Sequence, residues 1–202
     1  MIKSNKLLIV TGPSCAGKST LIYRILRGEC QKLCNQLELG NPLNWQLIIG
    51  ANLDSNKEQF IDRLMFDICI NTTSKNNKFE IFQELILRSE QVTVLTLCPP
   101  ADVVFWRMVE RMKNDLQIQY LMKGRDLLRL ANKLKKLWHY RNQGNMLVGY
   151  ERWFSFLEEV GIERSWLINC ISSNVDEAIP FSFESYMLLV NNKHIAKATP
   201  GL

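Results

Sequence analysis

The sequence contains no apolar run near the roughly 20 residues that a membrane-crossing helix needs. It also contains no internal repeat and no stretch whose composition predicts disorder. Lys3 and Lys6 lead into an apolar segment without the pattern of a cleavable signal peptide. We therefore expect a cytoplasmic protein that does not associate with membranes.

Patterns typical of metal sites and disulfide frameworks are missing as well. The six cysteines include one close pair, Cys30 and Cys34, with no nearby histidine or second pair to complete a zinc site. Histidine is scarce, with two residues in the chain. One of them, His139, stands alone in a basic and aromatic stretch, which is more typical of a structural residue than of a catalytic acid or base. We expect reduced, mostly structural thiols.

The overall composition is ordinary for a globular protein, with 47% hydrophobic and 22% charged residues. A chain of 202 residues can bury one substantial core but is short for two independent domains. We therefore expect a single domain over residues 1–202. The formal net charge of +5 suits a protein that handles phosphorylated molecules, and it equally suits weak attraction to nucleic acids.

The most informative segment is a complete G-x-x-x-x-G-K-S sequence near the N-terminus. Its members are Gly12, Pro13, Ser14, Cys15, Ala16, Gly17, Lys18 and Ser19. A loop with glycine at both ends can wrap its backbone N–H groups around phosphate oxygens, and the following helix directs its positive end at them. Lys18 then reaches the outer phosphates, and Ser19 offers a hydroxyl to a magnesium ion. With Thr20, which continues the helix, these residues form the predicted nucleotide-binding set.

The context of this motif agrees with a phosphate-binding role. Residues 7–10 form a continuous apolar run, as expected for a parallel strand buried on both faces. Behind the motif, Leu21, Ile22 and Ile25 recur at helical spacing, and Gly28 is a plausible helix end. The strand before and the helix after the loop are the two elements that this motif requires.

Strand and helix patterns alternate along the rest of the chain. Further strands are predicted at 45–49, 92–98 and 166–170, and further helices at 79–87, after Pro99-Pro100, at 127–137, 146–160 and 175–179. The residues after Pro180 carry no clear pattern. This alternation predicts an α/β fold, a three-layer sandwich with a mostly parallel sheet.

Three acidic residues compete for a role in the site. Asp54 follows the predicted strand 45–49, and ligands of open parallel sheets lie beyond the carboxyl ends of the strands, so Asp54 is the first candidate for general base or magnesium partner. Apolar spacing over 60–68 favours a helix, in which Asp62 and Asp67 would be solvated. Residues 64–67 can alternatively be a strand that ends in Asp67, the form of a magnesium-anchoring motif.

Arginines and other cations gather between residues 107 and 145, the region where we expect a helical lid. Arg107 and Arg111 lie one helical turn apart, and Arg125 follows further along. Each can close over a transferred phosphoryl group or be an ordinary surface charge. Residues 123–141 also predict a basic helix face with Trp138 beside it, which is a feature of single-strand nucleic-acid binders.

With these motifs the chain resembles the small P-loop kinases, the grouping that contains shikimate, gluconate, adenylate and guanylate kinases and the chloramphenicol phosphotransferases. The resemblance covers roughly residues 6–180, but only the Walker A loop is specific, and Cys15 stands where glycine is common in guanylate kinases. Residues 94–111 resemble the strand and arginine-bearing helix that lead into the family's lid. Residues 166–179 resemble the last strand and the loop beside the adenine, which implies a nucleotide contact for Ser173.

The resemblance implies an ATP-binding transferase that uses Mg²⁺ to pass the γ-phosphoryl group to a hydroxyl of a small molecule. In that mechanism Lys18 neutralises charge, Ser19 holds magnesium, Asp54 activates the acceptor hydroxyl, and Arg107, Arg111 and Arg125 close the site. Two alternatives stay open: a kinase that acts on nucleic-acid ends, and a nucleotide-binding regulatory protein without kinase activity.

Overall fold

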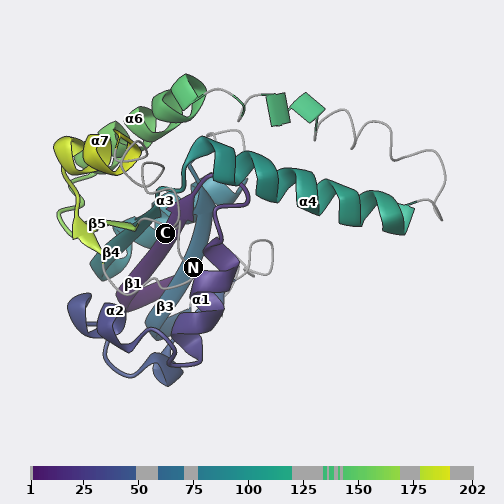
Figure 1. The fold of residues 1–202 in the computed structure, drawn as a ribbon. Helices are drawn as coiled ribbons and strands as arrows, with labels where there is room; N and C mark the ends of the chain where they lie inside the picture. Colours follow the sequence, from purple (N-terminus) through teal and green to yellow (C-terminus); the bar gives the residue numbers. More distant parts are fainter. Residues whose placement is uncertain are drawn as a thin grey trace, which may run out of the picture.

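The computed structural model describes residues 2–48, 59–70, 77–119, 134–135, 137–138, 141, 143–168 and 178–191. Within these ranges one six-stranded sheet runs in the order β2-β3-β1-β4-β5-β6 (Figure 1). Its strands are β1 (Ile2–Gly12), β2 (Gln46–Ile48), β3 (Gln59–Cys69), β4 (Ser89–Leu97), β5 (Ser165–Ile168) and β6 (Ile179–Pro180). All neighbours pair in parallel except β5 and β6, which are antiparallel. The predicted α/β fold with a mostly parallel sheet is confirmed.

Helices cover both faces of the sheet, because successive strand residues point to opposite sides. Leu8 and Val10 of β1 belong to one core, shared with α1 (Lys18–Leu26) and α2 (Gln31–Gln36). Leu7 and Ile9 belong to a second core on the other face. Its helices are α3 (Asn77–Leu87), α4 (Ala101–Gln119), α6 (Gln143–Glu159) and α7 (Phe183–Asn191). In Figure 1 the far end of α4 extends away from the sheet.

Several predicted elements are confirmed with small shifts of their ends. The strand over 92–98 is β4, the helix over 79–87 is α3, and the helix after Pro99-Pro100 is α4. The helix over 146–160 is α6, in which Trp153, Phe154 and Leu157 are buried as expected. Gly161 follows its end with a φ of 69°, a left-handed conformation that glycine adopts without strain.

The helix predicted over 60–68 is wrong, because β3 occupies these residues. Leu64, Met65 and Phe66 are all fully buried, since β3 lies between β2 and β1 and is covered by helices on both faces. A strand buried on both sides has no alternation of apolar and polar residues, and its apolar run can imitate helical spacing. The alternative of a strand over 64–67 is correct, but β3 continues beyond Asp67 to Cys69.

The bounds of several other strands and helices differ from the prediction. β2 begins one residue later than predicted, because Trp45 precedes it, directly after a 3-10 helix, η1 (Pro42–Asn44), and residue 49 lies outside the described residues. The predicted last strand is β5, but β6 follows it, and Ile179 belongs to β6 rather than to a helix. α7 lies in the segment whose sequence carried no clear pattern. The predictions on Gly50, on residues 71–76, on 127–133 and on Cys170 lie outside the described residues.

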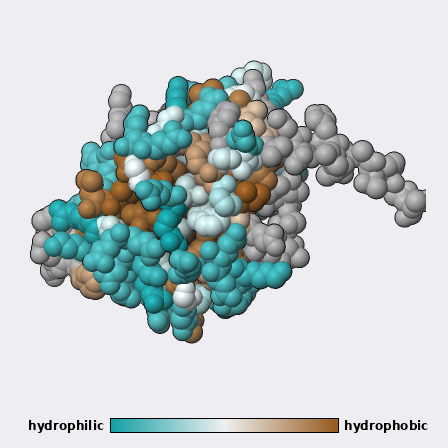
Figure 2. Space-filling model, turned by 90° about the vertical axis from the view of Figure 1, so that its left-hand side faces the viewer, coloured by the Kyte–Doolittle hydropathy of each residue, from teal (hydrophilic) through white to brown (hydrophobic). Residues whose placement is uncertain are grey.

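No helix in the described part of the chain combines the length and the hydrophobicity that crossing a bilayer requires. Figure 2 looks onto the side of the molecule where α2, β5 and α7 lie, and hydrophobic residues there form patches enclosed by hydrophilic ones. Val160 and Ile179 are 39% and 41% exposed, respectively. Single exposed apolar residues of this kind are normal on a protein surface.

Candidate functional site

The loop Gly12–Ser19 connects β1 to α1 at the carboxyl edge of the sheet. Gly12 has a φ of 147°, and a Cβ atom at this position would lie 2.9 Å from the carbonyl oxygen of Leu97 at the end of β4. Cys15 and Gly17 have φ values of 62° and 98°. Left-handed residues between right-handed ones are typical of loops whose amides line a concave anion-binding surface. Cys15 therefore keeps a backbone geometry that glycine usually adopts.

Lys18 opens α1 and folds back over the loop. Its Nζ donates to the carbonyl oxygens of Gly12 at 3.1 Å and Pro13 at 2.8 Å. These bonds hold the ammonium group at the concave side of the loop, next to the positive end of the α1 dipole. Ser19 and Thr20 lie in the same first turn with exposed side chains. The loop region thus concentrates positive charge with an exposed hydroxyl beside it.

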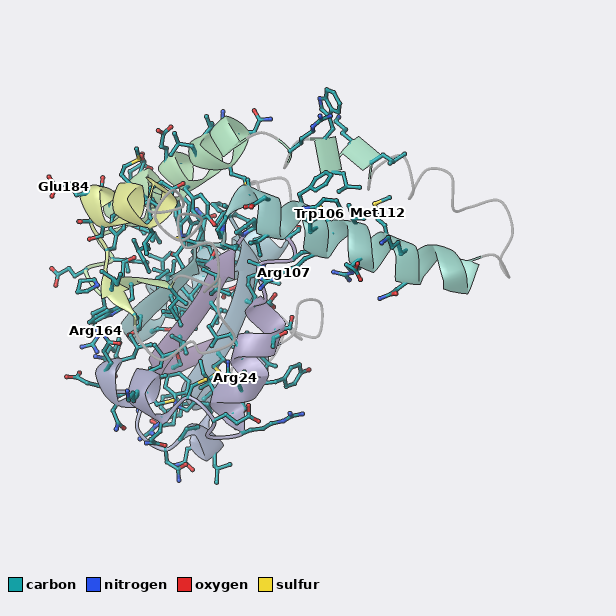
Figure 3. All side chains as sticks on the ribbon, viewed as in Figure 1. Arg24, Trp106, Arg107, Met112, Arg164 and Glu184 are labelled. Carbon is teal, nitrogen blue, oxygen red and sulfur yellow. The ribbon has the colours of Figure 1, made fainter. Side chains whose placement is uncertain are left out.

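Helix α4 contacts the loop through Arg107. Its Nη1 donates to the carbonyl oxygen of Ala16 at 3.1 Å, and it lies 3.8 Å from the position of a Cβ on Gly17. Figure 3 shows Arg107 between α4 and the loop. Arg111 lies one turn further along α4 with an exposed side chain. Of the three arginines predicted for a lid, Arg107 is therefore next to the loop, whereas Arg125 lies outside the described residues.

Strand β3 places an acid beside the loop. Asp67 is in register with Val10 of β1 and is half-buried, two residues before Cys69, which pairs with Gly12. Alternate residues share a face, and Met65 belongs to the core under α1, so Asp67 lies on the face that α1 covers. The level of Asp67 is about 7 Å back along the strand from that of Gly12. The acid is therefore close to the start of α1.

Asp67 was visible in the sequence but was not placed among the site residues. Its signal was the apolar run 64–66 directly before an acid, which was outweighed by the helical spacing of 60–68. The acid that was preferred, Asp54, lies outside the described residues, and so does Ser173. A second loop contact also escaped prediction: the Ser14 hydroxyl and the Cys69 thiol lie 3.9 Å apart and join the loop to the end of β3.

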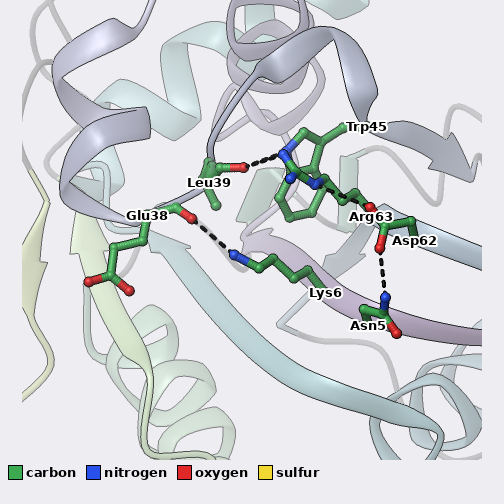
Figure 4. Close-up of polar contacts among 7 residues, drawn as sticks. All are labelled: Asn5, Lys6, Glu38, Leu39, Trp45, Asp62 and Arg63. Atoms are coloured by element: carbon green, nitrogen blue, oxygen red, sulfur yellow. Dashed lines mark hydrogen bonds and ion pairs between the residues drawn. The ribbon is translucent and has the colours of Figure 1, made fainter.

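A second group of hydrogen-bonded residues joins the amino halves of β1 and β3 to the connection between α2 and β2 (Figure 4). We call it the amino-half cluster; it consists of Asn5, Lys6, Glu38, Leu39, Trp45, Asp62 and Arg63. Asp62 accepts a 2.7 Å bond from Asn5 Nδ2 and lies 3.4 Å from Arg63 Nε. It is about 16 Å further from the loop along the strand than Asp67. Asp62 therefore has a structural role and no part in the loop site.

The main-chain carbonyl groups after α2 are the acceptors in this cluster. Leu39 O accepts from Trp45 Nε1 at 3.1 Å and from Arg63 Nη1 at 3.2 Å, and Glu38 O accepts from Lys6 Nζ at 3.4 Å. The side-chain donors satisfy carbonyl groups of a connection that has no strand partner. The cluster thus fixes the connection between α2 and β2.

Three of the five described cysteines, Cys30, Cys34 and Cys98, are buried. Cys30 and Cys34 are buried in the core under α1 and α2, and burial, followed by the proximity of Cys30, raises the pKa of the Cys34 thiol above its ordinary value. The described residues contain no group of three or more His, Cys, Asp or Glu side chains arranged to hold a metal ion. Magnesium needs fewer protein ligands, because it is held by one or two side chains together with phosphate oxygens and water.

Comparison with known proteins adds no further identification. No protein-family model matches the chain, and no curated protein sequence matches it.

Proposed function

We propose that the chain is an ATP-dependent phosphotransferase that passes the γ-phosphoryl group to a hydroxyl acceptor. One observation carries this proposal: the Gly12–Ser19 loop lies between a central parallel strand and a helix, and the neighbouring strand brings Asp67 toward the same helix start. A nucleotide site of this class needs a loop that holds phosphates, a cation beside them and an acid for magnesium.

The residues present fit the ligands. The backbone of the loop and the Lys18 ammonium bind the phosphates, and Lys18 exchanges its bonds to Gly12 O and Pro13 O for bonds to phosphate oxygens. Hydroxyl and carboxylate oxygens are the ligands that Mg²⁺ prefers, so Ser19 and Asp67 hold the ion. Magnesium, when bound, supplies neutralisation of charge on the phosphates. In this role Asp67, on β3, replaces Asp54, which the sequence analysis preferred as the magnesium partner.

The transfer step needs positioning more than covalent chemistry. The acceptor oxygen forms a bond to the γ-phosphorus, the bond from that phosphorus to the bridging oxygen breaks, and its electron pair leaves with ADP. The hydroxyl proton goes to a carboxylate, the role predicted for Asp54. Arg107, already bonded to Ala16 O, is the arginine best placed to reach the phosphates.

The acceptor has two candidates. The small molecule implied by the kinase resemblance stays a prediction. A nucleic-acid end is favoured by a specific observation, two exposed tryptophans, Trp106 on α4 and Trp138, whose ring lies under the Arg141 guanidinium.

ATP binding and turnover with magnesium, measured with small hydroxyl compounds, nucleosides and 5′-hydroxyl oligonucleotides, test the proposal. We expect Lys18→Ala to weaken ATP binding about 10-fold or more, because a charged hydrogen bond contributes about 1.5–3 kcal/mol. Asp67→Asn should lose the dependence of ATP affinity on magnesium. The matched variants Lys6→Ala and Asp62→Asn, in the amino-half cluster, should bind ATP as the unmodified protein does. Equal ATP affinity in Lys18→Ala and Lys6→Ala would contradict the proposal.

A further inference from the structure

Two tryptophans are exposed, Trp106 on α4 and Trp138 among the described residues 134–135, 137–138 and 141. Trp106 is 62% exposed and Trp138 is 73% exposed, although tryptophan is mostly buried in folded proteins. The rings of Phe105 and Trp106 form a T-shaped pair on α4, with ring centroids 5.4 Å apart. Two rings held in solvent in this way offer flat surfaces to a ligand.

Cations flank the Trp138 ring, and further exposed cations lie on α4. Arg111 lies on α4 with an exposed side chain, Lys135 precedes Trp138 by three residues, and the Arg141 guanidinium lies 5.8 Å over the centre of the Trp138 ring. Glu110, the one acid at the exposed positions of residues 106–114, pairs with Lys113 at 3.6 Å. We call Trp106, Arg111, Lys135, Trp138 and Arg141 the cation-aromatic surface.

The charge of the chain is concentrated in the segment that contains this surface. Residues 105–141 hold ten of the 25 Lys and Arg but three of the 20 Asp and Glu, so this segment carries +7 and the remaining chain −2. A positive field of this kind attracts a polyanion and speeds its association.

The cation-aromatic surface and the loop site share helix α4. Trp106 directly precedes Arg107, whose Nη1 bonds to Ala16 O of the loop. Leu137, next to Trp138, packs against the same core as Met108 of α4 and Met146 of α6. The segments that carry the two tryptophans therefore pack against the same core. In Figure 3 Trp106 and Arg107 lie on different sides of α4.

We propose that the cation-aromatic surface binds single-stranded nucleic acid, with bases stacked on Trp106 and Trp138 and phosphates at Arg111, Lys135 and Arg141. Alternating aromatic and cationic side chains are the means by which proteins hold single strands without reading their sequence. An anionic membrane is the less suitable partner, because lipid binding needs a broad apolar helix face. On α4, Trp106 is the one exposed apolar residue among the exposed positions of 101–114.

Fluorescence anisotropy of labelled oligo(dT), titrated with the full chain at several salt concentrations, tests this binding. We expect Trp106→Ala and Trp138→Ala each to weaken binding about 5- to 150-fold, the loss associated with one base stack. Trp106→Phe, which keeps a ring, should recover most of that loss. Arg111→Gln should lower the slope of log affinity against log salt by about 0.7, as for one lost phosphate contact on a single strand.

Matched controls lie on the opposite side of the sheet, where Tyr23 of α1 is 48% exposed and Lys32 of α2 is exposed. Tyr23→Ala and Lys32→Gln should leave both affinity and salt slope unchanged. All these positions are exposed, so circular dichroism should show folded variants. ATP binding is a separate readout. The Lys18→Ala variant should lose ATP binding but keep oligo(dT) binding.

Three results would overturn the proposal. One is wild-type binding of oligo(dT) that the tryptophan substitutions leave unchanged. Another is equal affinity for the single strand and for its duplex with oligo(dA), in which bases cannot stack on side chains. The last is binding to phosphatidylserine vesicles without binding to oligo(dT), which would assign the surface to a membrane.

Discussion

Polar contacts gather near both ends of strands β1 and β3, in the amino-half cluster and at the loop Gly12–Ser19. In the amino-half cluster, Trp45 and Arg63 donate to one main-chain carbonyl group, that of Leu39, and so hold the chain to itself. At the carboxyl edge the backbone takes left-handed conformations at Gly12 and Cys15, and a lysine folds over the turn. Polar composition alone does not distinguish a structural cluster from a site. Left-handed backbone does not distinguish them either, because Glu38 in the amino-half cluster has a φ of 55°. The loop differs in its place, between the carboxyl end of a parallel strand and the start of a helix, where open parallel sheets bind their ligands.

The largest effect should come from Gly12→Ala. A Cβ atom would lie 2.9 Å from Leu97 O at a φ of 147°, so we expect a loss of about 3 kcal/mol in the free energy of unfolding, together with loss of ATP binding. Gly28→Ala is the matched control, because Gly28 has a φ of 76° but no atom within 4 Å of the added Cβ. It should lose about 1 kcal/mol and bind ATP normally. Urea unfolding of both variants measures the difference, and equal losses would contradict a special role for Gly12.

Alkaline pH should lower the free energy of unfolding through Tyr186 of α7. Burial, and then the proximity of Cys98 and Glu151, raises the pKa of Tyr186 above its ordinary value of 10.0. Above pH 10 the unfolded chain loses the phenolic proton before the folded chain does, so stability falls as pH rises. Between pH 9 and 11 the wild type should lose about 1 kcal/mol more than Tyr186→Phe, measured by urea unfolding. Parallel pH profiles would show that Tyr186 ionises equally in both states.

Two buried aromatic donors allow a direct comparison of the two halves. Tyr150 OH donates to Leu97 O at 2.8 Å near the loop, and Trp45 Nε1 donates to Leu39 O at 3.1 Å in the amino-half cluster. Tyr150→Phe should cost about 1 kcal/mol, the contribution of one hydrogen bond, and should also weaken ATP binding because Leu97 O lies against Gly12. Trp45→Phe should reduce stability without changing ATP affinity. Calorimetric titration with ATP distinguishes the two variants. Weaker ATP binding in Trp45→Phe would contradict the expected difference between the two halves.

The smallest effect should come from the ion pair at the rim of the amino-half cluster. Glu38 Oε2 lies 3.1 Å from Arg164 Nη2, and the Glu38 side chain is 70% exposed. Glu38→Gln should change the free energy of unfolding by less than about 0.5 kcal/mol, because exposed ion pairs contribute little. Chemical denaturation at low and high salt measures it. A loss comparable to that of Tyr150→Phe would show that charge pairs, rather than bonds to carbonyl groups, hold this cluster.

Local patterns were enough to predict much of the site. The apolar run 7–10, the glycines of the loop and the helical spacing behind it specify strand, turn and helix within one short segment, and the structure confirms all three. The prediction for β3 failed because its apolar residues face two cores at once. The burial that decides between helix and strand there comes from distant segments.

Local sequence is enough to specify the glycine-rich loop, its flanking elements and the excess of charge in residues 105–141, because each depends on neighbouring residues. Tertiary structure alone decided that Asp67 lies beside Val10, that Arg107 bonds to the loop carbonyl of Ala16, and that Asp62 belongs to a structural cluster. These placements depend on strand order and register. Both are fixed by which faces of the sheet are buried and not by any local pattern.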